Sequence, residues 1–311
     1  MNWRTKARIQ NAIAMLPESF SNSVYYAIQR KFGGLKSINP VKRLNAGIET
    51  WRRIQSQDRD PKGGVFFEVG TGRTVNVPLS FWLMGAEKTI TIDLNPYLKE
   101  ELVLESIDFI CNNKPDIEAL FGELIEPKRF EHLIVWNQGK HRSLAAALDL
   151  IQVRYIAPGD AMHTSLPPKC IDFHTSFTVF EHIPGDVIAG IILEANRLLR
   201  PGGMLVHCID YSDHFAHDDK SIGKMNFLQI EDKEWNKLAG NRYMYMNRIR
   251  HHEYLEIFKN SGQTIVIDEP ATDPKSLEGF QNGALIPATK FNQMSPEQLA
   301  ITSSWIVSQR S

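Results

Sequence analysis

The chain has 311 residues, of which 42% are hydrophobic and 23% charged, and its formal net charge is −1 at pH 7. This length can bury a full core, the balanced charge gives no global attraction to nucleic acid, and no apolar run approaches the roughly 18 residues of a membrane span. The three cysteines are scattered and form no CxxC pair, and the first residues are too polar for a signal peptide, so we expect a cytoplasmic protein.

Residues 1–60 are predicted to form a helical cap. Helical spacing with breakers at Pro17, Gly33 and Pro40 indicates two or three short helices, followed by a linker over 60–64. This segment holds eleven Lys or Arg against four Asp or Glu, a balance of +7 that leaves −8 for the rest of the chain. Two interpretations stay open: a solvated helical face, or a patch that binds an acidic substrate or an anionic membrane surface.

A strand, a glycine turn, a helix and a second strand follow. The apolar residues Val65-Phe66-Phe67 lead into Glu68-Val69-Gly70-Thr71-Gly72-Arg73, and two glycines this close after a buried strand mark a turn at which a ligand can approach the main chain. The next helix ends at Gly85, and the alternating run 89–92 predicts the second strand. Asp93 ends that strand, where a carboxylate can accept hydrogen bonds from both hydroxyls of a ribose.

The stretch 97–150 is predicted to be a helical insertion, because it carries three apolar periodic segments where one connecting helix would suffice. A short third strand, 153–156, leads to Asp160 and Ala161. The fourth strand and its exit lie in 170–184, a helix in 186–199, and the fifth strand in 204–210, with 264–269 and 303–309 as a closing antiparallel pair. Alternating strands and helices predict an α/β fold with a Rossmann-like, doubly wound, seven-stranded sheet, mostly parallel with an antiparallel last strand. The predicted domains are the 1–60 cap and a 61–311 domain.

These motifs resemble those of the class I S-adenosylmethionine-dependent methyltransferases: an acid before Gly-x-Gly, an acid ending the second strand, and Leu199-Arg200-Pro201-Gly202-Gly203 before the fifth strand. The chain departs from the pattern at Arg73-Thr74, where a third glycine often stands. Val75 occupies the position of the third glycine in dinucleotide-binding enzymes, and its branched side chain there argues against a dinucleotide cofactor. The resemblance implies a methyltransferase that binds S-adenosylmethionine and releases S-adenosylhomocysteine.

The resemblance also implies roles for individual residues. Gly70, Thr71 and Gly72 would face the methionine part of the cofactor with Glu68 beside the turn. Asp93 would bind the ribose, and Leu94 would lie on the adenine ring. The remaining predicted cofactor contacts are Asp160 and Ala161 to adenine, and Ser176 and Phe177 by their main chain near the sulfonium.

A hydroxyl acceptor must lose a proton, and histidine is the natural general base. The predicted catalytic residues are His182, after the fourth strand, and Asp210 and His214, after the fifth. Asp210, Asp213, His214 and His217 could instead hold a divalent ion, but we predict no metal: Thr178 replaces the first Glu of the Glu-x-x-Glu-His ion site found in ubiquinone-type O-methyltransferases.

The predicted function is therefore methyl transfer to a hydroxyl of a small molecule or glycan. A non-catalytic S-adenosylmethionine-binding scaffold and an NAD-type oxidoreductase remain as alternatives. Nucleic acid is not an expected partner, since no base-flipping signature follows the fourth strand. The basic amino-terminal segment is expected to help cover the acceptor, peripheral membrane contact through it stays open, and the sequence does not indicate an oligomeric state.

Overall fold

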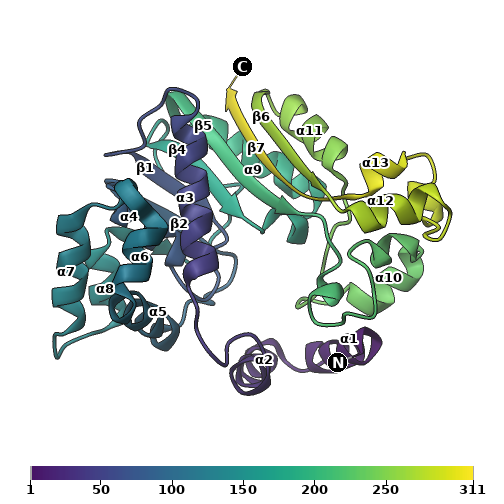
Figure 1. Cartoon of the computed structure of the whole chain (residues 1–311), viewed down its shortest axis with the longest axis horizontal. Coiled ribbons are helices and arrows are strands. Elements are labelled where there is room, and N and C mark those ends of the chain that lie inside the picture. Colours follow the sequence, from purple (N-terminus) through teal and green to yellow (C-terminus); the bar gives the residue numbers. More distant parts are fainter. Residues whose placement is uncertain (1, 311) are drawn as a thin grey trace. The chain divides into compact units, whose positions relative to one another are not determined.

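The computed structural model describes residues 2–310, and its strands form one sheet. The strands are β1 (Val65–Val69), β2 (Lys88–Ile92), β3 (Val153–Ile156), β4 (Ile171–Phe177), β5 (Leu199–Asp210), β6 (Gln263–Thr272) and β7 (Ile301–Arg310). Their order in the sheet is β3-β2-β1-β4-β5-β7-β6 (Figure 1). The strand order therefore reverses between β1 and β4, which is where open α/β sheets place their ligands.

Both directions of pairing occur in this sheet. β1 pairs in parallel with β2 and β4, and β2 pairs in parallel with β3. At the other edge, the Tyr211 amide just after β5 donates to Thr302 at the start of β7, and the Asp273 amide just after β6 donates to Ala300 just before β7. β7 thus runs antiparallel to both neighbours, and the predicted fold class is confirmed.

Helices connect these strands. The α-helices are α1 (Trp3–Ala14), α2 (Glu18–Phe32), α3 (Val41–Gln55), α4 (Asn76–Leu83), α5 (Glu100–Asn112), α6 (Lys114–Phe121), α7 (Pro127–Asn137), α8 (Leu144–Leu150), α9 (Gly185–Leu198), α10 (Asp232–Ala239), α11 (His251–Asn260), α12 (Pro274–Gln281) and α13 (Pro296–Leu299). Short 3-10 turns are η1 (Gly122–Leu124), η2 (Phe180–His182), η3 (His214–His217), η4 (Asn226–Gln229) and η5 (Thr289–Phe291). The insertion between β2 and β3 contains four α-helices, one more than the three apolar periods predicted. The additional helix is α7, which buries Phe130 and Leu133.

Contacts divide the chain into two compact units. The β1 unit comprises 37–177, 190–207 and 307–310, and the α1 unit comprises 2–36, 178–189 and 208–306. α3, from the predicted cap, packs on α4 within the β1 unit, and α1 packs on α10 within the α1 unit. The predicted boundary near residue 60 stays a prediction.

The core of the β1 unit centres on β1, whose five residues are all buried. The Phe66 ring stacks on Phe81 at 4.1 Å and on Trp51 of α3 at 5.8 Å, between ring centroids, and meets Phe173 of β4 at 4.9 Å. Aromatic pairs at these separations add to the free energy of burial. This packing fixes the strand that carries Glu68 and leads into the glycine turn.

The α1 unit has an apolar core of its own. Trp3 and Ala7 of α1 pack with Phe215, Trp235 and Phe291, among others, and the Trp3 and Phe215 rings lie 5.5 Å apart. Lys6 forms an ion pair with Asp218 at 2.5 Å, and Arg4 forms one with Glu234 at 3.4 Å. Part of the basic charge of the amino-terminal segment is therefore neutralised within this unit.

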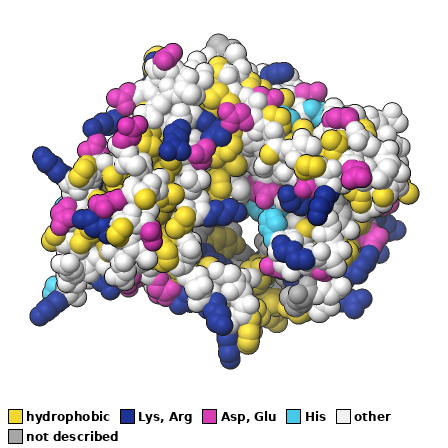
Figure 2. All heavy atoms as spheres, in the orientation of Figure 1, with side chains coloured by type: hydrophobic (Ala, Val, Ile, Leu, Met, Phe, Trp, Pro, Cys, Tyr) yellow, Lys and Arg dark blue, Asp and Glu magenta, His cyan; other side chains and the backbone are white. Residues whose placement is uncertain are grey.

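The visible face in Figure 2 shows Lys and Arg side chains interspersed with Asp and Glu, with no patch of a single sign. Among residues 2–310, the helices are all too short or too polar to cross a membrane.

Candidate functional site

The glycine turn after β1 has the backbone conformation that its two glycines predict. Gly70 and Gly72 have φ of 86° and 67°, a region that side-chain-bearing residues rarely adopt. The Gly70 amide donates to the Ile92 carbonyl at 2.8 Å, so the turn is fastened to the end of β2. A Cβ built on Gly72 would meet no heavy atom within 4 Å. The torsion angle therefore requires glycine at 72, and the space beside it is free for a ligand.

Asp93 lies directly beside this turn. Its Oδ2 accepts from the Gly72 amide at 2.8 Å and its Oδ1 from the Asn95 amide at 3.1 Å. Burial raises the pKa of Asp93, and the backbone hydrogen bonds from Gly72 and Asn95 oppose that shift. Leu94, next in the chain, has a 72% exposed side chain. An acid held by two amides beside an exposed apolar residue is the arrangement expected at the ribose and adenine of a nucleoside.

Glu68 is buried beneath the same turn. Thr91 donates its hydroxyl to Glu68 Oε2 at 2.6 Å, and the Thr71 and Thr91 hydroxyl oxygens lie 2.6 Å apart. Burial raises the pKa of Glu68 to about 7, against the hydrogen bond from Thr91 and the charge of Arg43, which lower it. The Glu68 carboxyl thus changes its charge near neutral pH.

The loop after β3 brings Asp160 and Ala161 to the end of β2. The Gly159 amide donates to the Asp93 carbonyl at 2.9 Å. The exposed Asp160 carboxylate accepts from the Met162 amide at 2.8 Å and lies 3.1 Å from His163 Nδ1. The Met162 amide, followed by His163, lowers the pKa of Asp160. An ionised acceptor here can receive an amino group such as that of adenine.

The end of β4 carries interactions that the sequence did not predict. Ser176 is buried, and its Oγ lies 2.7 Å from His207 Nδ1, while His207 Nε2 lies 3.3 Å from His174 Nδ1. The Phe177 carbonyl accepts from Arg43 at 3.2 Å, and the Arg43 guanidinium stands over the Phe177 ring. Polar histidines within otherwise apolar strands were the available signal for this buried chain.

In the α1 unit, His182 has a defined tautomer. Its Nδ1 lies 2.7 Å from the Tyr245 carbonyl, which can only accept, so we assign the proton to Nδ1 and the lone pair to Nε2. The residue has an exposed surface, but its ring packs edge-on against His214 at 4.9 Å between centroids. Burial of the ring, with the charge of His214, lowers the pKa of His182 to about 4.

Asp210, His214 and His217 form a cluster after β5. Asp210 Oδ2 lies 3.5 Å from His214 Nε2 and 3.8 Å from His217 Nε2. The other oxygen, Oδ1, accepts from the Ser212 amide and hydroxyl at 2.8 and 2.6 Å. Burial raises the pKa of Asp210, but the neighbouring His214 and Ser212 outweigh it and bring the pKa to about 2. The carboxylate is therefore ionised at any physiological pH.

Asp213, which the sequence grouped with these residues, has a different environment. Its carboxylate is fully buried, caps η3 through the Phe215 amide at 2.8 Å and accepts from the Asn226 amide group at 3.2 Å. Asp213 holds η3 in place and belongs to neither of the two three-residue groups whose donor atoms come close enough to share a metal ion.

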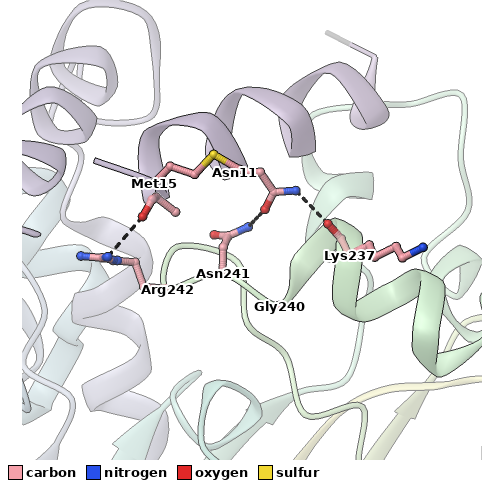
Figure 3. A pocket seen from close by; sticks show the side chains of 7 residues that line it. Asn11, Met15, Lys237, Gly240, Asn241 and Arg242 are labelled. Carbon is pink, nitrogen blue, oxygen red and sulfur yellow. Dashed lines mark hydrogen bonds between the residues drawn. The ribbon is translucent and has the colours of Figure 1, made fainter. Parts of the chain in front are cut away.

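A separate pocket of about 490 Å³ lies between the end of α1 and the segment after α10 (Figure 3). Asn11 donates to the Lys237 carbonyl and accepts from Asn241, both at 2.8 Å, and Arg242 donates to the Ala14 carbonyl at 3.2 Å. These bonds attach α1 to α10 and to the segment that follows it. The lining residues include no predicted site residue, so we assign this pocket no part in the chemistry.

The structure thus gathers the predicted residues into two groups. Within the β1 unit, hydrogen bonds link Glu68 to Thr71 through Thr91, and Gly72 directly to Asp93. His182, Asp210 and His214 lie together in the α1 unit.

Comparison with known proteins agrees with the fold. Residues 136–207, less than half of the chain, match the family model of a methyltransferase domain. No curated protein matches the sequence.

Solved structures of similar arrangement include three from microorganisms. The PH0226 protein of Pyrococcus horikoshii is 12% identical with a TM-score of 0.48 and covers 92% of this chain and 98% of its own. An S-adenosylmethionine-dependent methyltransferase of Mesorhizobium loti is 12% identical with a TM-score of 0.43, covering 86% and 100%. One of Methanosarcina mazei is 13% identical with a TM-score of 0.44, covering 83% and 96%. These likenesses are too distant to support an inference about function.

Residues 136–207 thus match a methyltransferase domain, and the seven strands form a Rossmann-like sheet. These findings support an enzyme that transfers a methyl group from S-adenosylmethionine.

Proposed function

We propose that this enzyme methylates a hydroxyl group of a small molecule or glycan, with His182 as the general base. The observation that carries the proposal is the tautomer of His182. Its Nδ1 proton is directed to the Tyr245 carbonyl, which leaves the Nε2 lone pair to accept a proton. Methyl transfer from a sulfonium depends mainly on alignment, but a neutral hydroxyl must also lose its proton as it attacks.

The cofactor is proposed to bind beside the glycine turn. Gly72 offers an open main chain, Asp93 is held for the ribose, and Leu94 exposes an apolar face for the adenine. Asp160 and Ala161 lie next to the end of β2 through the Gly159 bond, which supports a role at the adenine amino group. Ser176 and Phe177, at the end of β4, are proposed to contact the sulfonium side through their main chain.

Cofactor binding is tested by calorimetric titration with S-adenosylhomocysteine, for which we expect micromolar affinity. Asp93→Ala removes the carboxylate proposed to hold the ribose and should lose most of that affinity. Asp149→Ala, an exposed carboxylate on α8, is the matched control and should bind as the wild type does. No binding of S-adenosylhomocysteine by the wild type, or a higher affinity for NAD, would refute the proposal.

The role of His182 is tested with the acceptor once it is identified, by mass spectrometry of metabolites from cells that lack the protein. The expected signal is one species lighter by a methyl group. His182→Ala should lower kcat while S-adenosylhomocysteine still binds, and added imidazole should restore part of the rate. Full activity of His182→Ala, or an acceptor methylated on nitrogen or carbon, contradicts this assignment.

A non-catalytic scaffold stays the second candidate, and slow methylation across a broad acceptor panel would discard it. The cytoplasmic location stays a prediction. So does the part of the basic segment in covering the acceptor or touching a membrane, although Arg52 and Arg53 already pair with Glu49 within α3.

A further inference from the structure

We propose that Asp210, His214 and His217 form a binding site for a divalent transition-metal ion. The three side chains offer one carboxylate oxygen and two imidazole nitrogens, all within 4.8 Å of one another. One carboxylate with two histidines is a donor set typical of zinc and ferrous iron, whereas calcium and magnesium prefer oxygen donors alone.

The separations between these atoms suit an ion better than direct hydrogen bonds. Asp210 Oδ2 lies 3.5 Å from His214 Nε2 and 3.8 Å from His217 Nε2, beyond the roughly 2.7–3.2 Å of an N–H···O bond. Donor atoms about 2.1 Å from a tetrahedral zinc ion would lie about 3.4 Å from one another. His214 Nε2 is also buried and makes no hydrogen bond, a state that costs free energy unless something occupies the space beside it.

The local backbone aims the two rings at the same point. His214 and His217 are the first and last residues of η3, and residues three apart in a 3-10 helix eclipse one another. Their rings accordingly stack at 4.9 Å between centroids. Asp213 caps this turn and so holds the backbone that carries both imidazoles.

Ser212 contacts two of the proposed ligands. Its hydroxyl donates to Asp210 Oδ1 at 2.6 Å, which orients the carboxylate and leaves Oδ2 toward the histidines. The Ser212 hydroxyl oxygen also lies 3.2 Å from His217 Nε2, a contact that a bound ion would replace. Residues that orient a ligand in this way tune metal affinity. The His217 side chain is 52% exposed, against 18% for His214. The site is therefore open on one side, so that an ion would keep a coordination position for water or another oxygen.

A second group, Glu181, His182 and His214, shares one histidine with this site. We favour the Asp210 group because Glu181 is buried almost completely, whereas the His217 side chain is about half exposed and lets an ion enter. Use of the open position by an acceptor hydroxyl rests on the proposed function; the binding of the ion does not.

The experiment measures metal binding by the full chain after treatment with a chelator. Isothermal titration with Zn²⁺ should show one site, and Co²⁺ at that site should give the strong visible absorption of a tetrahedral complex. His217→Ala and Asp210→Asn should each weaken binding by about 100-fold or more, and Ser212→Ala by about 10- to 100-fold. His141→Ala, at an exposed position outside the cluster, is the control and should bind as the wild type does.

Because His217 is largely exposed, His217→Ala should fold, which its thermal melt and its affinity for S-adenosylhomocysteine will report. A wild type that binds no Zn²⁺ overturns the proposal even if the cofactor binds. Loss of the ion in His182→Ala but not in His217→Ala overturns it in favour of the other group. Failure of S-adenosylhomocysteine binding with Zn²⁺ affinity intact would reject the proposed function and leave the metal site standing.

Discussion

Replacing Glu68 by Gln should make the protein more stable at alkaline pH and change little in acid. The Glu68 carboxyl lies in the core beneath the glycine turn, where an ionised group is poorly solvated, and its pKa is raised from 4.5 to about 7. A glutamine amide keeps the shape and an oxygen that can accept from the Thr91 hydroxyl, but it never ionises.

The magnitude follows from the two pKa values. Between pH 4.5 and about 7 the folded protein holds the Glu68 proton and the unfolded chain has lost it. The contribution of Glu68 to the free energy of unfolding is therefore fully present below pH 4.5, and it is lost as the pH rises through 7. A shift from 4.5 to about 7 corresponds to about 3 kcal/mol at about 1.4 kcal/mol per pKa unit. Glu68→Gln should gain up to that amount at pH 8 and almost nothing at pH 4.5.

The assay is urea unfolding followed by tryptophan fluorescence, with the midpoint measured at several pH values from 4.5 to 8.5. The difference between variant and wild type should grow over this range. Glu87→Gln, an exposed position in the same unit, serves as control and should follow the wild type. Parallel curves for Glu68→Gln and the wild type, or a variant that is weaker at pH 8, would show that Glu68 is not forced to ionise in the core.

Three further outcomes are expected. Arg250→Met should lower the free energy of unfolding by about 3–5 kcal/mol. The fully buried guanidinium donates to the Tyr211, Leu299 and Ile301 carbonyls, and its loss leaves them unpaired. A loss below about 1 kcal/mol contradicts this reasoning. Gly159→Ala should lower the free energy of unfolding by about 1–3 kcal/mol, since the new Cβ would lie 2.7 Å from the Ile92 side chain. At Gly223 a Cβ would meet nothing within 4 Å, so an equal loss in Gly223→Ala would refute the steric reason. With His182 as base, kcat/KM should fall in acid near pH 4, its lowered pKa, and an acid limb near 6.5 would exclude it.

The parts of the fold that short-range patterns determine could be predicted from the sequence. The glycine turn and the acid that follows β2 depend on neighbouring residues, and the alternation of strands and helices depends on apolar periods. The predicted fold class is confirmed. Strand ends were less predictable: β5 begins at Leu199, five residues before the predicted start at Met204, and it includes Gly202, which has φ of 78°. The Pro-Gly-Gly pattern alone indicated a turn there.

Interactions between distant segments could not be predicted. Nothing in the local sequence shows that Arg43 meets Phe177, or that His207 meets Ser176. The role of Asp213 could not be predicted either. An aspartate at this position could bind a metal ion, but its buried carboxylate caps η3 instead. The roles of the predicted cofactor and catalytic residues stay predictions until they are tested.

The buried pair His174 and His207 gives this fold a built-in weakness toward acid. Burial lowers the pKa of His174 to about 3 and that of His207 well below its usual value. From about pH 6.5 downward the two histidines bind protons in the unfolded chain but stay neutral in the folded protein. Acidification therefore favours unfolding, with up to two protons bound for each molecule that unfolds. A moderately acidic compartment would therefore destabilise the part of the sheet in which β4 carries His174 and β5 carries His207.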